Sequence, residues 1–399
     1  MGILSKSFSS AGNSLLIDIE SGAVTFAVYS EEALKKRSKD AVLFVRRVFI
    51  PEEKIFDRTK VEEEMNSAMA ACREGTEKFG KLSNTYVSVG APWVYVKTVT
   101  ASKTWETPVE ITDDIVKNVL QEEGEKKTPY HEYFRNFFGN IVEPVRTLRS
   151  SKEQYFINGY PFPTYHYKKG RELTVVEEDY VFIQWILKLI EKECERYNSA
   201  PPFILSYNAI IPFFEKELEY LFVMMGAYTT EVGYIDTVSR SVRFLEEFPI
   251  GEKTLVNAVE RSGKKTSAEA ESLINMHVEK RLDTQLSPED RRILSNVEGE
   301  WVKEFEKILH KFSEEAEMPA TVFAVPFERA GWLNTLIRSE SFTQPRLPEK
   351  AFNVILSEAF QGDELTFLAN VPYPRLALLF MYLAQTLRSS ILSVRIYGS

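Results

Sequence analysis

Two strand–turn–strand patterns, which begin about 200 residues apart, limit the folds open to this chain. In residues 15–29 (LLIDIESGAVTFAVY), two β-rich runs flank Ser21 and Gly22, which predicts a tight hairpin whose glycine supplies a positive φ angle. Residues 218–232 (LEYLFVMMGAYTTEV) repeat this order of strand, glycine-containing turn and strand. Predicted strands alternate with predicted helices along the rest of the chain, which is typical of α/β proteins. Together these features predict a duplicated architecture with a cleft between two halves.

Length and composition exclude several classes of protein. The 399 residues correspond to two or three domains at roughly 150 residues each. Lys and Arg total 49 against 58 Asp and Glu, and this net charge of −9 argues against nucleic-acid binding. The two cysteines, Cys72 and Cys194, are too few for a disulfide framework, so a reducing compartment is expected. The sequence contains neither a secretory signal nor an apolar run long enough to span a membrane, which predicts a cytoplasmic protein.

The hairpin turns carry residue types that can bind phosphate and metal. A tight glycine turn presents several backbone N–H groups at one point, and such a nest can hold a phosphate. A nearby aspartate such as Asp18 can hold a hydrated magnesium ion. A plainer interpretation stays open, because Asp18 can cap a neighbouring N–H group and Thr229 and Thr230 can be ordinary strand residues.

The two hairpins and the motifs that follow them resemble the actin-like ATPases of the FtsA and PilM type, in the superfamily of actin, Hsp-type chaperones and sugar kinases. Residues 15–29 resemble the first phosphate loop of that family, and residues 221–232 (LFVMMGAYTTEV) resemble the second. Residues 266–274 (TSAEAESLI) resemble the helix that reaches the adenosine, and residues 318–333 occupy the place of the adenosine loop. Residues 157–173 (INGYPFPTYHYKKGREL) resemble part of a small domain inserted in FtsA.

The resemblance implies an α/β fold with duplicated actin-like (ribonuclease-H-like) halves, an interdomain cleft and an FtsA-type inserted small α+β domain. The first half would comprise residues 8–88 and 176–215, and the inserted domain residues 89–175. The second half would span residues 216–392 and include a helical subdomain at 253–317.

Seven positions match the family's phosphate loops, and the resemblance implies that they contact the phosphates of ATP. They are Asp18, Ser21, Gly22, Gly226, Thr229, Thr230 and Gly251. Asp18 would also hold Mg²⁺ through water, and no catalytic residue is assigned.

Other positions depart from the family's pattern. Glu20 replaces a glycine of the first loop, Glu252 replaces a second glycine after Gly251, and Val325-Pro326 replaces the Gly-Gly of the adenosine loop. Met224 replaces an aspartate, and a thioether can neither position a metal nor orient a water molecule. We therefore expect ATP and Mg²⁺ to bind weakly, or no cofactor to bind, and we expect no efficient enzyme.

Three local patterns carry further expectations. Asn158-Gly159 predicts another hairpin. Residues 107–123 begin with Thr107-Pro108 and predict a helix, with Asp113 and Asp114 near its start. Residues 376–387 (LALLFMYLAQTL), bracketed by Arg375 and Arg388, predict an apolar core helix rather than a membrane anchor. The resemblance implies that this helix packs on the second half.

An aromatic cluster in the inserted domain is a candidate partner-binding surface, since aromatic residues and arginine are favoured at interface centres. It comprises Tyr160, Phe162, Tyr165 and Tyr167, near Lys168, Lys169 and Arg171. The same residues could equally form the local core of that domain.

The function implied by the resemblance is a cytoplasmic scaffold at the inner face of a bacterial membrane, in cell division or type IV pilus-like assembly. It would bind a membrane-protein partner and no nucleic acid, and self-association is left open. Two alternatives remain, an active Mg-ATP-binding ATPase that cycles or polymerises and a small-molecule kinase of the same superfold. Met224 argues against both of these enzymes.

Overall fold

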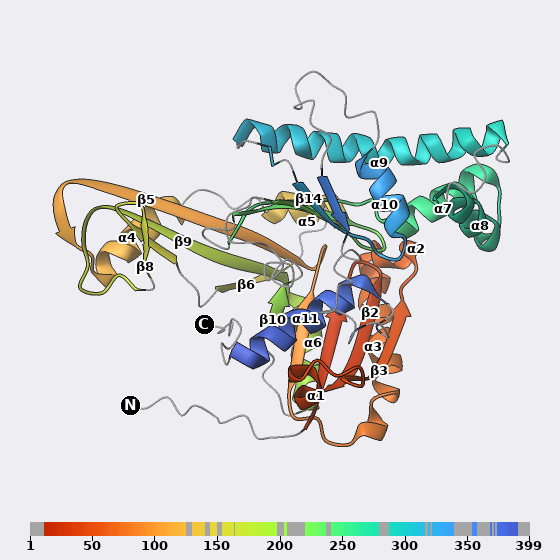
Figure 1. Ribbon diagram of the computed structural model, residues 1–399, viewed down its shortest axis with the longest axis horizontal. Coiled ribbons are helices and arrows are strands. Elements are labelled where there is room, and N and C mark those ends of the chain that lie inside the picture. Colours follow the sequence, from red (N-terminus) through yellow and green to blue (C-terminus); the bar gives the residue numbers. More distant parts are fainter. Residues whose placement is uncertain are drawn as a thin grey trace.

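The computed structural model consists of two α/β parts stacked on each other and a lobe that projects to one side (Figure 1). It describes residues 12–124, 130–139, 144–149, 154–162, 164–197, 203–205, 220–236, 241–278, 287–315, 318–319, 321–338, 353–356, 368, 371 and 373–389. Each part has its own five-stranded sheet. The predicted pairing of two α/β halves with an inserted small domain therefore agrees with the structure.

The first half is built on a sheet with the strand order β10-β4-β1-β2-β3. Strands β1 and β2 form the first predicted hairpin, and β4 runs parallel to β1. The strands are β1 (Asn13–Ile19), β2 (Ala23–Ser30), β3 (Val42–Phe49), β4 (Thr85–Val89) and β10 (Phe203–Leu205).

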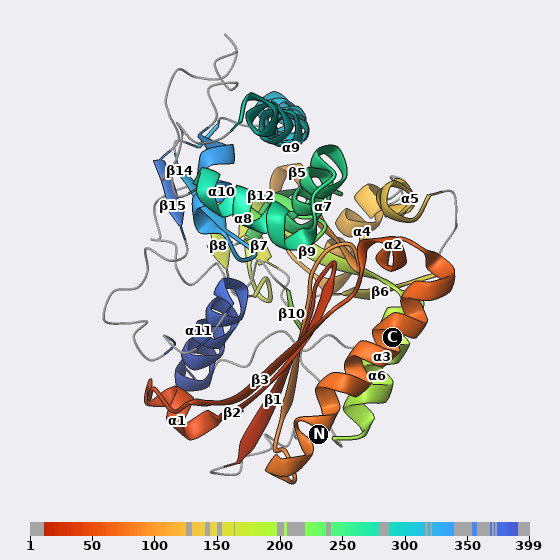
Figure 2. The ribbon, with the colours of Figure 1, turned by 90° about the vertical axis from the view of Figure 1, so that its right-hand side faces the viewer.

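Helices cover both faces of this first sheet. Helices α3 and α6 lie on one side and α11 lies on the other (Figure 2). The helices are α1 (Glu31–Lys35), α2 (Glu52–Ile55), α3 (Arg58–Glu74), α6 (Gln184–Glu195) and α11 (Pro374–Ser389), with a 3₁₀ turn at Glu77–Phe79. Asp57 caps α3 by accepting a hydrogen bond from the backbone N–H of Thr59 at 3.0 Å, which satisfies one of the unpaired donors at the start of the helix.

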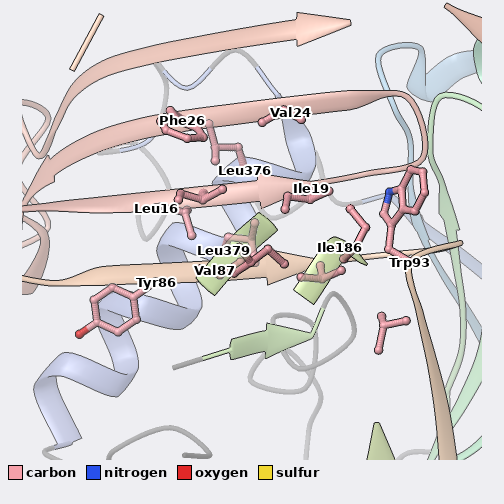
Figure 3. Close-up of a cluster of buried hydrophobic side chains, with 14 of the residues drawn as sticks. Leu16, Ile19, Val24, Phe26, Tyr86, Val87, Trp93, Ile186, Leu376 and Leu379 are labelled. Carbon is pink, nitrogen blue, oxygen red and sulfur yellow. The ribbon is translucent and has the colours of Figure 1, made fainter. Parts of the chain in front are cut away.

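Helix α11 is buried, as its composition predicted, but it covers the first half and not the second. Phe380 of α11 packs edge-on against Tyr29 of β2, with 5.4 Å between the ring centres, and Leu376 and Leu379 lie in the same buried core as Leu16 of β1 (Figure 3). The expectation that this helix packs on the second half is therefore wrong. Helix α11 covers the face of β1 and β2 that lies opposite helices α3 and α6.

The second half repeats the arrangement, with the strand order β13-β12-β11-β14-β15. Its strands are β11 (Tyr220–Met225), β12 (Thr230–Asp236), β13 (Ser241–Phe248), β14 (Thr321–Val325) and β15 (Asn353–Leu356). Its helices are α7 (Glu252–Gly263), α8 (Ser267–Val278), α9 (Pro288–Glu315) and α10 (Ala330–Ile337). Strands β11 and β12 form the second predicted hairpin.

The two faces of β11 are buried in different places because successive side chains point to opposite sides of a strand. Leu221 and Val223 pack with helices α7 to α10. Phe222 and Met224 belong instead to the core of the first half. One hydrophobic core thus continues from the first half into the second.

The lobe is built on a third five-stranded sheet, in the order β5-β9-β7-β8 with β6 also paired to β9, and it has a small core of its own. It contains β5 (Val94–Glu110), α4 (Asp113–Gly124), α5 (Tyr130–Phe138), β6 (Val145–Arg149), β7 (Gln154–Ile157), β8 (Tyr160–Phe162) and β9 (Lys169–Ile183). The hairpin predicted at Asn158-Gly159 is present, and both residues have positive φ angles, 52° and 80°. The predicted helix begins at Asp113, as the two aspartates indicated, whereas the preceding residues, with Pro108, belong to β5 where its pairing with β9 becomes irregular. The residue bounds of the three units stay predictions.

Candidate functional site

The turns of the two hairpins touch each other. The backbone N–H of Tyr228 donates a hydrogen bond of 3.0 Å to the hydroxyl oxygen of Ser21, across a separation of 207 residues. A Cβ atom added to Gly22 would lie 2.3 Å from the Tyr228 ring, and one added to Gly226 would lie 3.1 Å from the Ser21 hydroxyl. The structure therefore brings the predicted phosphate-loop residues together, but with no gap between the two turns.

Gly22 is needed for this contact and not for its backbone conformation. The glycines with positive φ in the described part of the chain are Gly80, Gly139 and Gly159, so the predicted positive φ at Gly22 is wrong. The hairpin is closed instead by a hydrogen bond of 2.9 Å from the backbone N–H of Glu20 to the carbonyl of Ala23.

The second hairpin is sealed by the start of helix α7. The backbone N–H groups of Glu252 and Lys253 donate to the carbonyls of Gly226 and Ala227 at 3.0 and 2.8 Å. A Cβ atom on Gly251 would lie 2.5 Å from the Ala227 carbonyl oxygen, which accounts for a glycine at this position. These N–H groups at a helix start could bind an anion if they were free. Here they are used within the protein.

The two threonines of the second loop are also buried. The Thr230 hydroxyl donates to the Ile250 carbonyl at 2.6 Å and accepts from the Trp301 indole N–H at 3.0 Å. Thr229 is 2% exposed. Both are placed beside the hairpin turn, as predicted, and Thr230 is fully engaged with protein groups.

Asp18 is paired with an arginine that lies 357 residues further along the chain. Arg375, in the first turn of α11, donates from Nε to both carboxylate oxygens of Asp18 at 3.2 Å and from Nη2 to Oδ1 at 3.1 Å. Its Nη2 also lies 3.4 Å from the Ser88 hydroxyl, and its Nη1 lies 3.9 Å from the Glu231 carboxylate. The position that the resemblance assigns to a magnesium ligand thus holds a guanidinium group.

A second arginine, Arg47, pairs with the carboxylate of Glu20. Arg47 donates to Glu20 at 2.8 Å, and both side chains are almost fully buried. The guanidinium carbon of Arg47 lies 4.2 Å from the centre of the Phe327 ring and 4.3 Å from that of Tyr373, so two aromatic faces enclose it. We refer to Asp18, Glu20, Glu231, Arg47 and Arg375 as the buried charge cluster.

The electrostatics of the buried charge cluster favour retention of a proton. Burial raises the pKa of Glu20 to about 7, with Arg47 opposing the shift and Asp18 adding to it. Burial also raises the pKa of Glu231, although Arg375 opposes that shift. Burial alone would lower the pKa of Arg375, but its carboxylate neighbours hold it above its ordinary value. Three carboxylates and two guanidinium groups therefore share one desolvated volume.

The region that the resemblance assigns to the adenosine is closed by another ion pair. Glu252, fully buried, accepts hydrogen bonds from the backbone N–H groups of Glu328 and Arg329 at 3.0 and 2.9 Å. Its other carboxylate oxygen pairs with the Arg329 guanidinium. The glutamate that replaces a family glycine thus joins the start of α7 to the loop after β14.

These contacts determine whether a magnesium ion and phosphate could bind between the two hairpin turns in this structure. Phosphate binding would need free N–H groups at the turns, and metal binding would need a free Asp18 carboxylate. Tyr228 and Glu252 already use their N–H groups, and Asp18 is held by Arg375. Within the described ranges, no group of three or more His, Cys, Asp or Glu side chains is arranged to hold a metal. The arrangement does not fit that group.

The structure divides the aromatic cluster of the lobe. Phe162 and Tyr165 pack against the lobe's small core, and the Tyr165 hydroxyl donates to Asp113 at 2.8 Å. Tyr160 and Tyr167 are 70% and 93% exposed. Only the last two are therefore available to a partner.

Comparison with known proteins identifies the fold. No protein-family model matches the sequence, and no curated protein matches it. The solved structure of a PilM-PilN type IV pilus biogenesis complex contains a chain that matches with a TM-score of 0.53, over 94% of this chain and 98% of that one, at 12% identity. The protein has an actin-like ATPase fold. At this identity the likeness extends to the actin-like fold alone.

Two further structures of the actin-like kind match with lower TM-scores. A protein of Bacteroides thetaiotaomicron with an actin-like ATPase fold gives 0.38, at 8% identity, over 92% of this chain and 98% of that one. The activator of the 2-hydroxyisocaproyl-CoA dehydratase from Clostridium difficile, solved with ADPNP bound, gives 0.38, at 9% identity, over 96% and 99%.

Sequence reasoning placed the two hairpins of the actin-like fold together but missed their partners. Arg47 and Ser88 were not singled out, although Arg47 pairs with Glu20 and the Ser88 hydroxyl lies 3.4 Å from Arg375. One signal was present. Asp18 and Glu20 follow and flank the apolar residues Leu15, Leu16, Ile17 and Ile19, and buried carboxylates require cations.

Two hollows of the described surface lie away from the hairpins. One, of about 360 Å³, lies between α3 and α6 and is lined by residues that include Trp185 and Leu189. The other, of about 610 Å³, lies near the ends of the same helices and is lined by residues that include Arg73 and Tyr197. None of the helices in the described ranges has the length and apolar character needed to cross a membrane.

Proposed function

We propose that the protein is an actin-like scaffold in which nucleotide binding is weak or lost, and which binds a membrane-protein partner at the inner face of a bacterial membrane. Cell division and type IV pilus-like assembly are the two settings that the resemblance to FtsA and PilM suggests. The single observation that carries the proposal is the pairing of Asp18 with Arg375.

The pairing opposes nucleotide binding for an electrostatic reason. A Mg-nucleotide at the hairpins would have to displace Arg375 from Asp18, and breaking a buried pair costs about 3–5 kcal/mol when one charge is left unpaired. The phosphates would then lie beside the buried carboxylates of Glu20 and Glu231, which repel them.

The inserted lobe is where we place partner contacts. The resemblance to FtsA implies them, and the PilM chain of similar fold was solved together with PilN. Tyr160 and Tyr167 offer exposed aromatic side chains on this lobe.

Thermal unfolding with and without millimolar Mg-ATP tests the proposal. A ligand at about 100 times its dissociation constant would add about 2.7 kcal/mol to the folded state, which raises the melting temperature by several degrees. We expect no such rise in the wild type. The matched variant is Asp18→Asn, which keeps the shape of the side chain.

Two results would overturn the proposal. A Mg-dependent rise that Asp18→Asn abolishes would favour the active ATPase. Release of phosphate or phosphorylation of an added sugar, measured in steady state, would favour the ATPase or the small-molecule kinase respectively.

A further inference from the structure

Arg375 contacts three parts of the molecule at once. Its guanidinium bonds to Asp18 and Ser88 of the first half and faces Glu231 of the second half at 3.9 Å. A Cβ atom added to Gly90, at the root of the lobe, would lie 2.9 Å from the same guanidinium. The side chain is only 12% exposed.

We infer that Arg375 is an intramolecular latch, which holds the two halves and the root of the lobe in the closed arrangement without any bound ligand. The inference rests on the proposed function in one respect, namely that no nucleotide bridges the halves. Arg375 supplies instead the positive charge that the facing carboxylates need.

The position of Arg375 at the start of helix α11 explains why it can contact both halves. Helix α11 is anchored on the first half by Leu376 and Leu379, next to Arg375 in sequence or one turn away. The anchored helix therefore presents the guanidinium to Glu231, which belongs to β12 of the second half.

The carboxylate that faces Arg375 also holds the lobe. Glu231 accepts a hydrogen bond of 3.1 Å from the backbone N–H of Ala91, three residues before the first strand of the lobe. Without Arg375, Asp18 and Glu231 would be like charges in a desolvated site, and their repulsion would act across the boundary between the halves. Loss of the latch should therefore loosen both the boundary and the root of the lobe.

The chain offers a matched control for this effect. Arg329 pairs with buried Glu252 and is 14% exposed, so it resembles Arg375 in residue type, burial and partner. The Arg329–Glu252 pair lies entirely within the second half. Arg329→Gln removes a comparable ion pair without touching the boundary.

Four backbone amides report on the latch by hydrogen exchange. The N–H groups of Tyr228 and Ala91 donate across the boundary, to Ser21 and Glu231. The N–H groups of Gly226 and Gly90, one or two residues away, donate within their own halves, to the carbonyls of Thr229 and Ile19. Each boundary amide thus has an internal reference close to it in sequence.

Residue-resolved hydrogen exchange, without nucleotide, on the wild type, Arg375→Gln and Arg329→Gln tests the inference. In Arg375→Gln we expect the amides of Tyr228 and Ala91 to exchange at least about tenfold faster while Gly226 and Gly90 keep their rates. In Arg329→Gln we expect all four amides to keep their wild-type rates.

The double variant Asp18→Asn with Arg375→Gln covers the case in which the single variant does not fold, because it removes the paired charges together. The same two boundary amides should accelerate in it. If hydrogen exchange becomes faster at all four amides, or at none of them, in whichever variant folds, the latch inference is overturned. Because no nucleotide is present, this result is separate from the Mg-ATP test, and either can fail alone.

Discussion

Glu20 occupies a turn, where a carboxylate ordinarily faces water, yet its side chain is 5% exposed. Arg47 neutralises it from β3, and Phe327 and Tyr373 enclose that arginine. Glu20, which stands where the FtsA and PilM type has a glycine, is therefore part of the core, because Arg47 and its aromatic neighbours enclose the carboxylate.

The raised pKa of Glu20 predicts that the free energy of unfolding is larger at low pH than at high pH. The pKa rises from an ordinary value of 4.5 to about 7 through burial, so the folded state binds a proton that the unfolded state releases between these values. This contribution to stability is complete below about pH 4.5 and is lost as the pH rises through 7, by on the order of 3 kcal/mol. Urea unfolding of the wild type and Glu20→Gln from pH 5 to 8 measures it.

Glu20→Gln should flatten this dependence without abolishing it. Burial shifts the pKa of Glu231 and Glu247 in the same direction, so some loss of stability with rising pH remains. Equal slopes in the wild type and the variant would show that Glu20 is ionised throughout this range.

Gly22 is expected to tolerate no side chain. In Gly22→Ala the new methyl group would lie 2.3 Å from the Tyr228 ring, which forces the two hairpins apart and costs about 1–3 kcal/mol. Gly299, inside helix α9, is the matched control, since nothing lies within 4 Å of its added Cβ. Gly299→Ala should stabilise by about 0.5–1 kcal/mol, and chemical unfolding compares the two. Equal effects at both positions would contradict the tight contact.

Sequence patterns predicted where several site residues lie but not which side chains they pair with. The positions of Ser21, Gly226 and Gly251 were predicted because turns and motifs are local in sequence. The partner of Asp18 lies 357 residues away, and no local pattern indicates which distant cation will reach a buried carboxylate. The missing information is tertiary.

Helix α11 shows the same limit for an element. Its apolar residues predicted burial, and Leu379 and Phe380 are fully buried. A helix that is apolar on all sides gives no indication of which surface it covers, so the prediction assigned it to the wrong half. The irregular end of β5 is a second case, where the predicted helix includes residues 107–110 although they belong to the strand, which loses its regular pairing there.

Leu379→Ala should test the role of α11 in the core. We expect a loss of about 2–5 kcal/mol, because the residue is fully buried against the first sheet. Leu43→Ala on β3 is the control, since Leu43 is 41% exposed and the same change should cost about 1 kcal/mol or less there. Urea unfolding provides both values. If the two variants lose equally little stability, α11 does not form part of the core.

At the scale of the molecule, the two halves are joined by a common hydrophobic core and by hydrogen bonds between helices α2 and α7. Phe222 and Met224 of the second half lie in the core cluster of the first. Glu52 of α2 accepts hydrogen bonds at 2.8 Å from Asn257 and Arg261 of α7. The thioether that replaces a family aspartate thus contributes to the packing between the halves.

Shared packing predicts that the two halves unfold together. We expect the fluorescence and circular-dichroism transitions in urea to coincide, as they do when no intermediate is populated. Two separated transitions would mean that each half is stable alone and that the common core contributes little.

The placement of α11 also has a consequence for synthesis on the ribosome. Strands β1 and β2 emerge early, but the helix that covers their apolar face, and the arginine that neutralises Asp18, follow 357 residues later. At translation speeds of roughly 5–20 residues per second, this face stays uncovered for tens of seconds. During that interval the nascent first half has an open hydrophobic surface and an uncompensated charge, so its early strands are natural clients for a chaperone.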